Sequence, residues 1–224
     1  MRILALDAAT EGCSAALIGP DLALSRFEVA PRRHADLLLP MAEELLAEAG
    51  WSLHDLDALA FGRGPGAFTG LRIAAGLIQG LALGADLSVV GISDLAALAA
   101  GARRSAGVNR CLVVNDARMQ EVYWAAYDFD DRDEPRCLGE EQVAPPAAVV
   151  APAGEWYPAG NGWMAYPEAL ATVHAAANGP VAAIHPHALD IARLAASRVA
   201  RGDAGSAADA IPVYVRDQVA RKSA

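Results

Sequence analysis

The chain has 224 residues, 54% of them hydrophobic, which is enough for one large domain or two small ones with a buried core. Its formal net charge of -9 argues against direct binding of a nucleic acid, because that affinity comes largely from clustered lysine and arginine. No basic leader precedes the first apolar run and the apolar segment 71–83 is too short for a bilayer, so we expect a cytoplasmic protein with no membrane span.

Two β-hairpins with an acid in the turn are predicted, one at the start of the chain and one near its middle. Residues 2–18 contain two apolar runs separated by a polar turn that begins at Asp7. Residues 110–127 repeat this plan around Asp116, and their second run is rich in residues that favour strands. The repeat of the pattern predicts two lobes, each opening with a hairpin.

Strand and helix patterns alternate between the two hairpins. Apolar spacing predicts an amphipathic helix over 36–49, a buried strand over 55–61 and a second helix over 69–83. Thr69 is the expected N-cap of the second helix. The alternation of the two patterns indicates an α/β protein.

The lobes are predicted to comprise residues 1–103, with the partner-binding helices, and residues 104–224. A helix over 91–102 begins at a cap formed by Ser93 or Asp94. A last helix over 185–202 either packs on its own lobe or crosses to the first one.

The loop GRGPGAFTGLR, residues 62–72, lacks both the lysine and the spacing of a Walker phosphate loop. Its alternating glycines do not match a dinucleotide fingerprint, and the proline removes an amide donor. We therefore predict a tight strand-to-helix corner and keep phosphate binding as the alternative. The corner is formed by Gly62, Gly64, Pro65, Gly66, Thr69 and Gly70.

The helix that follows this corner carries a stripe of glycines. Gly76, Gly80 and Gly84 recur every four residues, so one side of the helix has almost no side chain. Glycine inside a helix costs up to about 1 kcal/mol relative to alanine, so three of them indicate close backbone packing. That packing is either within the lobe or against a second subunit.

Six segments, which together span nearly the whole chain, resemble the YeaZ family, the bacterial TsaB proteins of tRNA threonylcarbamoyladenosine biosynthesis. The resemblance implies the two-lobed superfold of actin, hexokinase and the heat-shock ATPases. The glycine loop with its helix and the second hairpin are its specific elements. The matching segments are ILALDAATEGCSAAL, RRHADLLLPMAEELL, DLDALAFGRGPGAFTGLRIAAGLIQGLA, NDARMQEVYWAAY, GNGW and AIPVYVRD.

The resemblance implies a non-catalytic scaffold or activator subunit. Its partner is TsaD, a larger paralogue that transfers the threonylcarbamoyl group to tRNA, and a small P-loop ATPase, TsaE, joins the assembly. ATP and magnesium then belong to the partner subunits, and tRNA is contacted only indirectly. We expect a homodimer through the same helix faces when the partner is absent. The expected interface residues are Leu38, Met41, Leu45, Ile73, Gly76, Leu77, Gly80 and Leu81.

The alternative is a small ATPase or kinase of the same superfold with a degenerate nucleotide site at Asp7, Thr10, Asp116 and Arg118. Enzymes of the superfold bind phosphate at an Asp-x-Gly-Thr turn, whose glycine lets the backbone approach the anion. Here Ala9 stands in place of that glycine. Arg118 and Asp116 either pair within their own turn or meet an anion between the lobes. We therefore assign no catalytic residue.

No metal site is predicted. The transferase subunit of the family holds its metal with a HxxxH-type pair, which suits imidazoles at helical spacing. Two imidazoles alone supply too few ligands, so we expect the pair near residue 186 to lie in an exposed turn. No HxxxH pair exists among His34, His54, His174, His185 and His187.

Overall fold

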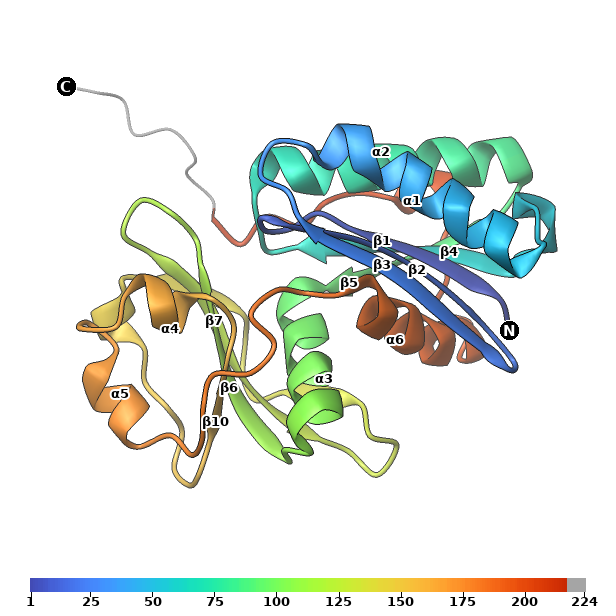
Figure 1. Ribbon diagram of the computed structural model, residues 1–224. Coiled ribbons are helices and arrows are strands. Elements are labelled where there is room, and N and C mark those ends of the chain that lie inside the picture. The colour runs from blue at the N-terminus through green and yellow to red at the C-terminus, as the bar shows by residue number, and fades with distance from the viewer. Residues whose placement is uncertain (217–224) are drawn as a thin grey trace.

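The computed structural model describes residues 1–216, and the chain forms two lobes, each built on a β-sheet (Figure 1). Residues 217–224, the end of the predicted second lobe, lie outside the described residues. The first sheet has the strand order β3-β2-β1-β4-β5. Its strands are β1 (Ile3–Asp7), β2 (Gly12–Gly19), β3 (Leu22–Val29), β4 (Ala58–Gly64) and β5 (Ser88–Ser93).

The second sheet has the order β10-β6-β7-β8, and β9 also pairs with β7. Antiparallel pairs open both lobes, β1 with β2 and β6 with β7, which are the two hairpins predicted from the sequence. The strands of this sheet are β6 (Arg110–Asp116), β7 (Val122–Phe129), β8 (Pro135–Cys137), β9 (Gln142–Ala144) and β10 (Tyr157–Ala159).

Helices cover both faces of the first sheet. In Figure 1, α1 and α2 lie on one face and α6 on the other, while α3 runs between the lobes. The helices are α1 (His34–Ala49), α2 (Phe68–Ala85), α3 (Asp94–Ala106), α4 (Gly162–Ala165), α5 (Ala171–Ala175) and α6 (Ala188–Ala200). Three short 3-10 turns complete the elements: η1 (Leu53–Asp55), η2 (Pro146–Ala148) and η3 (Ala207–Asp209).

Strand β1 is buried on both faces, which explains its unbroken apolar run. Successive side chains of a strand point to opposite faces, so Leu4 and Leu6 pack into the core under α1 and α2. Ile3 and Ala5 pack into the core under α6. The predicted two-lobed α/β fold with a hairpin at the start of each lobe is confirmed.

The course of the chain differs from a simple division into two halves. The boundary expected between residues 103 and 104 falls within α3, whose Leu95 and Leu98 pack in the core of the second lobe. Helix α6 packs against β1, β2 and β4, so it crosses back to the first lobe. The first lobe is therefore completed by α6, a segment distant from it in the chain.

Two helix starts test the predicted caps. Ser93 caps α3 by accepting a hydrogen bond from the Ala96 N–H at 3.2 Å. The prediction of Thr69 as the cap of α2 is wrong, because Ala67 occupies that position in an extended conformation and Thr69 lies inside the first turn. The glycine corner delivers the chain to α2 two residues earlier than the apolar spacing indicated.

Helix α2 is long and apolar enough, by length and composition, to span a membrane, with a mean hydropathy of 1.3 over 18 residues. From the sequence we expected no helix long enough to span a membrane, because the apolar segment 71–83 is too short. The same helix packs its buried face, including Leu71, Ala74 and Ile78, on the first sheet. Its apolar character thus serves the core of the first lobe.

Candidate functional site

Two buried carboxyl groups meet at the junction of β1 and α3. Asp7 and Asp94 are fully buried, and their carboxyl groups lie beside each other at Gly62. Asp7 also accepts from the Ala9 N–H at 3.1 Å, and Asp94 accepts from the Gly64 N–H at 2.5 Å. Burial raises the pKa of both acids, and the charge of Asp7 raises the pKa of Asp94 further, well above its ordinary value. The raised pKa favours the protonated form of Asp94 beside Asp7.

The glycine loop is a tight corner packed against these carboxyl groups and against the turn after β1. A Cβ at Gly62 would overlap the carboxyl oxygens of both acids. A Cβ at Gly66 or Gly70 would collide with carbonyl oxygens of the turn. Gly64 has a φ of 110°, which L-residues rarely adopt. The glycines are thus required by close approach of the backbone, and the corner fixes the direction of α2.

The turn after β1 does not fit a magnesium-bound nucleotide of the kind that actin-like enzymes use. The carboxyl group of Asp7 is occupied by Asp94 and faces away from solvent. The carbonyl of Ala9 accepts the Ala67 N–H at 2.7 Å, so the glycine corner covers the turn. Within residues 1–216, no group of three or more His, Cys, Asp or Glu side chains is placed to hold a metal ion.

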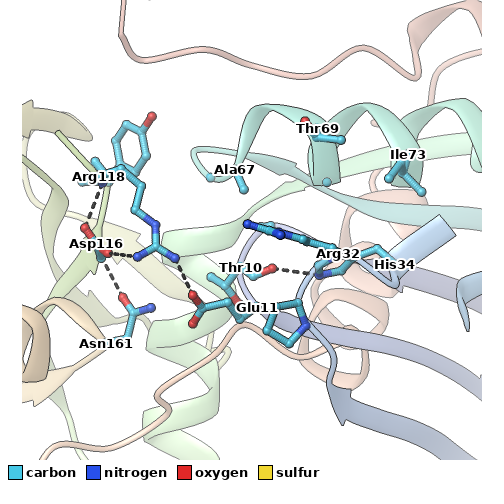
Figure 2. A pocket seen from close by; sticks show the side chains of 16 residues that line it. Thr10, Glu11, Arg32, His34, Ala67, Thr69, Ile73, Asp116, Arg118 and Asn161 are labelled. Carbon is cyan, nitrogen blue, oxygen red and sulfur yellow. Dashed lines mark hydrogen bonds and ion pairs between the residues drawn. The ribbon is translucent and has the colours of Figure 1, made fainter. Parts of the chain in front are cut away.

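A cavity of about 520 Å³ opens between the lobes beside this turn (Figure 2). Its walls come from the turn after β1, the starts of α1 and α2, and the turn between β6 and β7. Its volume lies within the range of small-molecule sites, about 300 to 1,000 Å³. The polar side chains that line it are Thr10, Glu11, Arg32, His34, Thr69, Asp116, Arg118 and Asn161. Of the four residues in the expected nucleotide site, the structure brings Thr10, Asp116 and Arg118 to the cavity and leaves Asp7 outside it.

Arg118 joins the two lobes at the cavity. Its guanidinium pairs with Asp116 of its own turn at 3.0 Å and also with Glu11 of the first lobe, as Figure 2 shows. Asp116 accepts a further bond from the Tyr166 hydroxyl at 3.0 Å, and its N–H donates to the Asn161 side chain at 2.7 Å. Two acids therefore neutralise this arginine.

The turn that carries Arg118 is strained. Arg118, Met119 and Gln120 have φ values of 59°, 55° and 61°, in the left-handed region that costs residues with a Cβ about 1–2 kcal/mol each. Hydrogen bonds hold the turn closed, among them one from the Ala117 N–H to the Glu121 carbonyl at 3.0 Å. The conformation directs Arg118 toward the first lobe.

Two histidines hold Thr10 from opposite sides. The Thr10 hydroxyl accepts from the Gly12 N–H at 3.1 Å and shares a hydrogen bond with His185 Nδ1 at 2.9 Å, while His34 Nε2 donates to the Thr10 carbonyl at 2.9 Å. Burial lowers the pKa of His185 and of His187, which favours neutral rings. His187 accepts a backbone N–H and caps α6. Both rings are half-buried, so the exposed turn predicted for them is wrong.

The glycine stripe of α2 faces outward. Gly76, Gly80 and Gly84 have no heavy atom within 4 Å of the position that a Cβ would occupy. Packing within the lobe therefore does not account for them. The neighbouring Leu83 is 77% exposed, which leaves an apolar side chain beside the stripe. The half-buried side chains at the edge of this face are Ile73, Leu77 and Leu81, which also contact the core.

The expected contribution of α1 to this face is wrong in part. Leu38, Met41 and Leu45 lie in the core beneath α1 and are no more than 8% exposed. Their spacing creates the apolar face of an amphipathic helix, and that face packs on the sheet of this chain. These three side chains are therefore unavailable to a partner.

A C-terminal segment, used in the sequence analysis only for the family resemblance, connects the two lobes near the glycine corner. The Val213 N–H donates to the Arg63 carbonyl at 2.6 Å, and Arg72 donates to the Tyr214 hydroxyl at 3.0 Å. Arg216 reaches the second lobe, where it donates to a carbonyl of the β6–β7 turn at 3.1 Å. No local pattern marks this segment, because its bonds are made to residues far away in the chain.

Three residues of the site also escaped prediction. Asp94 was considered only as a helix cap, although its carboxyl group lies against Asp7. Glu11 and Arg32 were not singled out. An acid or arginine in a polar turn is common, and only the meeting of the lobes gives these two a shared cavity.

The strand order of the first sheet and the hairpin at the start of each lobe define a protein of the two-lobed, actin-like class. A family model described as TsaD, tRNA N6-adenosine threonylcarbamoyltransferase, matches residues 27–221. The chain is also similar along nearly its whole length to proteins described as TsaB and to one described as YeaZ.

The tRNA threonylcarbamoyladenosine biosynthesis protein TsaB of Escherichia coli K12 is 42% identical over 226 residues, covering 99% of this chain and 97% of that protein. TsaB of Haemophilus influenzae is 37% identical over 231 residues, covering 99% of this chain and 96% of that protein. The solved structure of YeaZ from Pseudomonas aeruginosa is 47% identical with a TM-score of 0.86, covering 95% of this chain and 99% of that one. The chain belongs to the TsaB family.

Proposed function

We propose that this chain is a non-catalytic subunit in the formation of threonylcarbamoyladenosine in tRNA, and that it acts by pairing with a TsaD-like transferase. The observation that carries the proposal is the outward stripe of Gly76, Gly80 and Gly84, which contacts nothing in its own lobe. Its relatives in Escherichia coli and Haemophilus influenzae are described as proteins of this biosynthesis. A stripe without side chains lets the backbone of a partner helix approach closely.

The similarity to TsaD supports a particular form of pairing. The TsaD model matches this chain over residues 27–221, which include both α1 and α2. A TsaD subunit would thus present an equivalent pair of helices, and two similar subunits can pack through equivalent faces about an approximate two-fold axis. The same face would pair two copies of this chain when the transferase is absent, since an exposed apolar face favours contact.

The other components of the proposed assembly follow from the resemblance to the family. A net charge of -9 disfavours contact with tRNA phosphates, so tRNA binds through the partner. A TsaE-like ATPase would join the assembly, with ATP and magnesium held by the partner subunits. The assembly would work in the cytoplasm.

The first hairpin does not support the alternative hypothesis that this chain is an ATPase or kinase. A hydrolytic role needs a carboxylate that can orient water or a metal ion at the phosphate. Asp7 is fully buried against Asp94, and the glycine corner covers its turn. The proposed contribution of this chain is therefore structural.

The test is a leucine at the centre of the stripe. Because Gly80 has open space around it, Gly80→Leu should leave the chain folded while its side chain separates the two helices. Ala200→Leu is the matched control, since it adds bulk at an exposed helical position on α6, which covers the opposite face of the sheet. We expect Gly80→Leu to weaken pairing with the TsaD-like subunit by at least about tenfold, or 1.4 kcal/mol.

Pairing would be measured by isothermal titration calorimetry, with circular dichroism to verify folding of each variant. Light scattering of the chain alone would test self-association, which should respond to Gly80→Leu in the same way. Equal affinity of the parent chain and the folded Gly80→Leu variant would contradict the proposal.

A further inference from the structure

We propose that Arg72 anchors the TsaD-like partner by binding a carboxylate side chain that the partner presents beside α2. The inference rests on the proposed pairing role and adds the chemistry of the partner at one point of the interface. Three observations carry it: the aromatic groups that hold the guanidinium, its separation from every acid of the described chain, and its place on the outward face of α2.

Two aromatic side chains hold the guanidinium of Arg72 at the surface. Its central carbon lies 3.8 Å from the centre of the Phe68 ring, and its Nε donates to the Tyr214 hydroxyl at 3.0 Å. Phe68 is 42% exposed and Tyr214 is 40% exposed, so the cluster presents apolar surface around a cation. Arginine and large aromatic residues of this kind are enriched among the side chains that carry the affinity of protein interfaces. A guanidinium held in place also loses less conformational entropy when it binds a further group.

The positive charge of Arg72 is not balanced within the described chain. In residues 1–216, no carboxylate oxygen lies within 4.0 Å of its guanidinium, whereas Arg26 of the same lobe pairs with Glu48 at 2.6 Å. Arg72 is also the only charged residue of α2, in a chain whose net charge is -9. A single cation on an otherwise uncharged helix face favours an anionic group on the partner.

Arg72 lies on the outward face of α2 that carries the glycine stripe. It precedes Gly76 by four residues, about one helical turn, and both residues are exposed. A partner helix packed along the stripe would therefore extend over Arg72 and over the rings of Phe68 and Tyr214. Contact with these rings would exclude water from the guanidinium, and an ion pair is stronger where water is excluded.

A carboxylate matches this surface better than a nucleic acid does. One guanidinium can donate two parallel hydrogen bonds to one carboxylate, which balances the charge of both groups. Binding to the backbone of a nucleic acid depends instead on clustered cations, and α2 supplies no second one. The inferred partner group is therefore the side chain of an aspartate or glutamate of the TsaD-like subunit.

The test is calorimetric titration of the full chain with the TsaD-like subunit. Arg72→Gln should weaken pairing by about tenfold or more, because it leaves the partner carboxylate without its cation. Arg193→Gln is the matched control, since Arg193 is an exposed arginine of α6 on the opposite face of the sheet. Arg193 likewise has no carboxylate oxygen within 4.0 Å in residues 1–216, and its variant should bind as the parent chain does.

Two further measurements separate an ion pair from a loss of packing. The affinity of the parent chain should fall between about 50 mM and about 300 mM salt, because salt screens the two charges, and Arg72→Gln should reduce this dependence. Arg72→Lys keeps the charge but loses the two parallel bonds, so its affinity should lie between those of the parent and Arg72→Gln. Circular dichroism would verify that each variant is folded.

Equal affinity of the parent chain and the folded Arg72→Gln variant would overturn the proposal. An equal loss in Arg72→Gln and Arg193→Gln would overturn it too, as would Arg72→Lys binding no better than Arg72→Gln. Unchanged pairing together with weaker binding of tRNA to the assembly would show that Arg72 meets RNA instead.

Gly80→Leu distinguishes the failure of this inference from the failure of the pairing role. If Gly80→Leu weakens pairing and Arg72→Gln does not, the inference about Arg72 fails and the pairing face stands. If the parent chain does not bind the TsaD-like subunit, both fail.

Discussion

Burial and the charge of the adjacent Asp7 both oppose the ionisation of Asp94 and raise its pKa well above its ordinary value. Asp7 lies against Asp94 and accepts a hydrogen bond from the Ala9 N–H at 3.1 Å. Gly62 permits this contact, since any side chain there would enter the space of the two carboxyl groups. The buried pair of acids therefore lies where β1 meets α3.

The protonated state of Asp94 predicts how stability depends on pH. Burial raises its pKa in the folded chain above the ordinary value of an aspartate, so folding takes up a proton in the pH range between the two pKa values. The free energy of unfolding contributed by Asp94 is present at low pH and falls as pH rises through this window. In Asp94→Asn the amide can donate to Asp7 and accept from Gly64 without any proton uptake.

We expect Asp94→Asn to be more stable than the parent chain at pH 7, by on the order of 1 kcal/mol, with a flatter dependence on pH. Urea unfolding at pH 5 and pH 7 would measure it, with the exposed Asp131→Asn as control. A variant less stable than the parent at both pH values would show that Asp94 is needed as a carboxylate.

Helix α2 combines glycines of two kinds. Gly70 lies against the carbonyl of Ala8, whereas Gly76 faces open space. The first kind allows the helix to start against the β1 turn, and the second leaves its outer face bare. Their sequence context alone does not separate them, because both occupy the same apolar run.

Alanine substitutions should therefore act in opposite directions within one helix. Gly76→Ala should stabilise the chain by about 0.5–1 kcal/mol, because alanine has the better helix propensity and meets no atom. Gly70→Ala should destabilise it by about 1–3 kcal/mol, because its Cβ would overlap a backbone oxygen. Thermal unfolding of the two variants measures both effects. The same sign for both would contradict the packing described for α2.

The sequence correctly predicted those elements whose apolar residues recur at a regular spacing along the chain. The hairpins around Asp7 and Asp116 and the helices α1 and α2 follow from alternation and from helical periodicity. Strand β3 was missed because it lies at the edge of the sheet and is largely exposed, so it has no clear buried stripe. The buried side chains of α1 show what spacing leaves open. Helical spacing identified their apolar face, but it did not show that the sheet of this chain covers that face.

The whole molecule depends on segments that leave one lobe and return to the other. Helix α6 completes the first lobe after the chain has formed the second, and the segment after η3 runs from the glycine corner to the β6–β7 turn. Arg216 at its end has a side chain only 15% exposed and pairs with Glu121. The relation between the lobes, and the cavity between them, could not be predicted from local patterns.

Removal of the Arg216 contact should reduce the stability of the whole chain. We expect Arg216→Ala to cost about 1–3 kcal/mol, since it leaves a carbonyl and a carboxylate without their donor. Arg136→Ala is the control, because Arg136 is 66% exposed and pairs with Asp128 at the surface, where ion pairs contribute about 0–1 kcal/mol. Urea unfolding should show the larger loss for Arg216, and equal losses would contradict a role for this segment in joining the lobes.

We propose that this chain works by pairing through α2 and performs no chemistry at Asp7. Its most direct test is threonylcarbamoyl transfer to tRNA by TsaD- and TsaE-like subunits, with the threonylcarbamoyl adenylate supplied, in the presence and absence of this chain. We predict that activity requires the chain, persists with Asp7→Asn, and is lost with Gly80→Leu. Loss of activity with Asp7→Asn while the subunits still assemble would show instead that the first hairpin takes part in the chemistry.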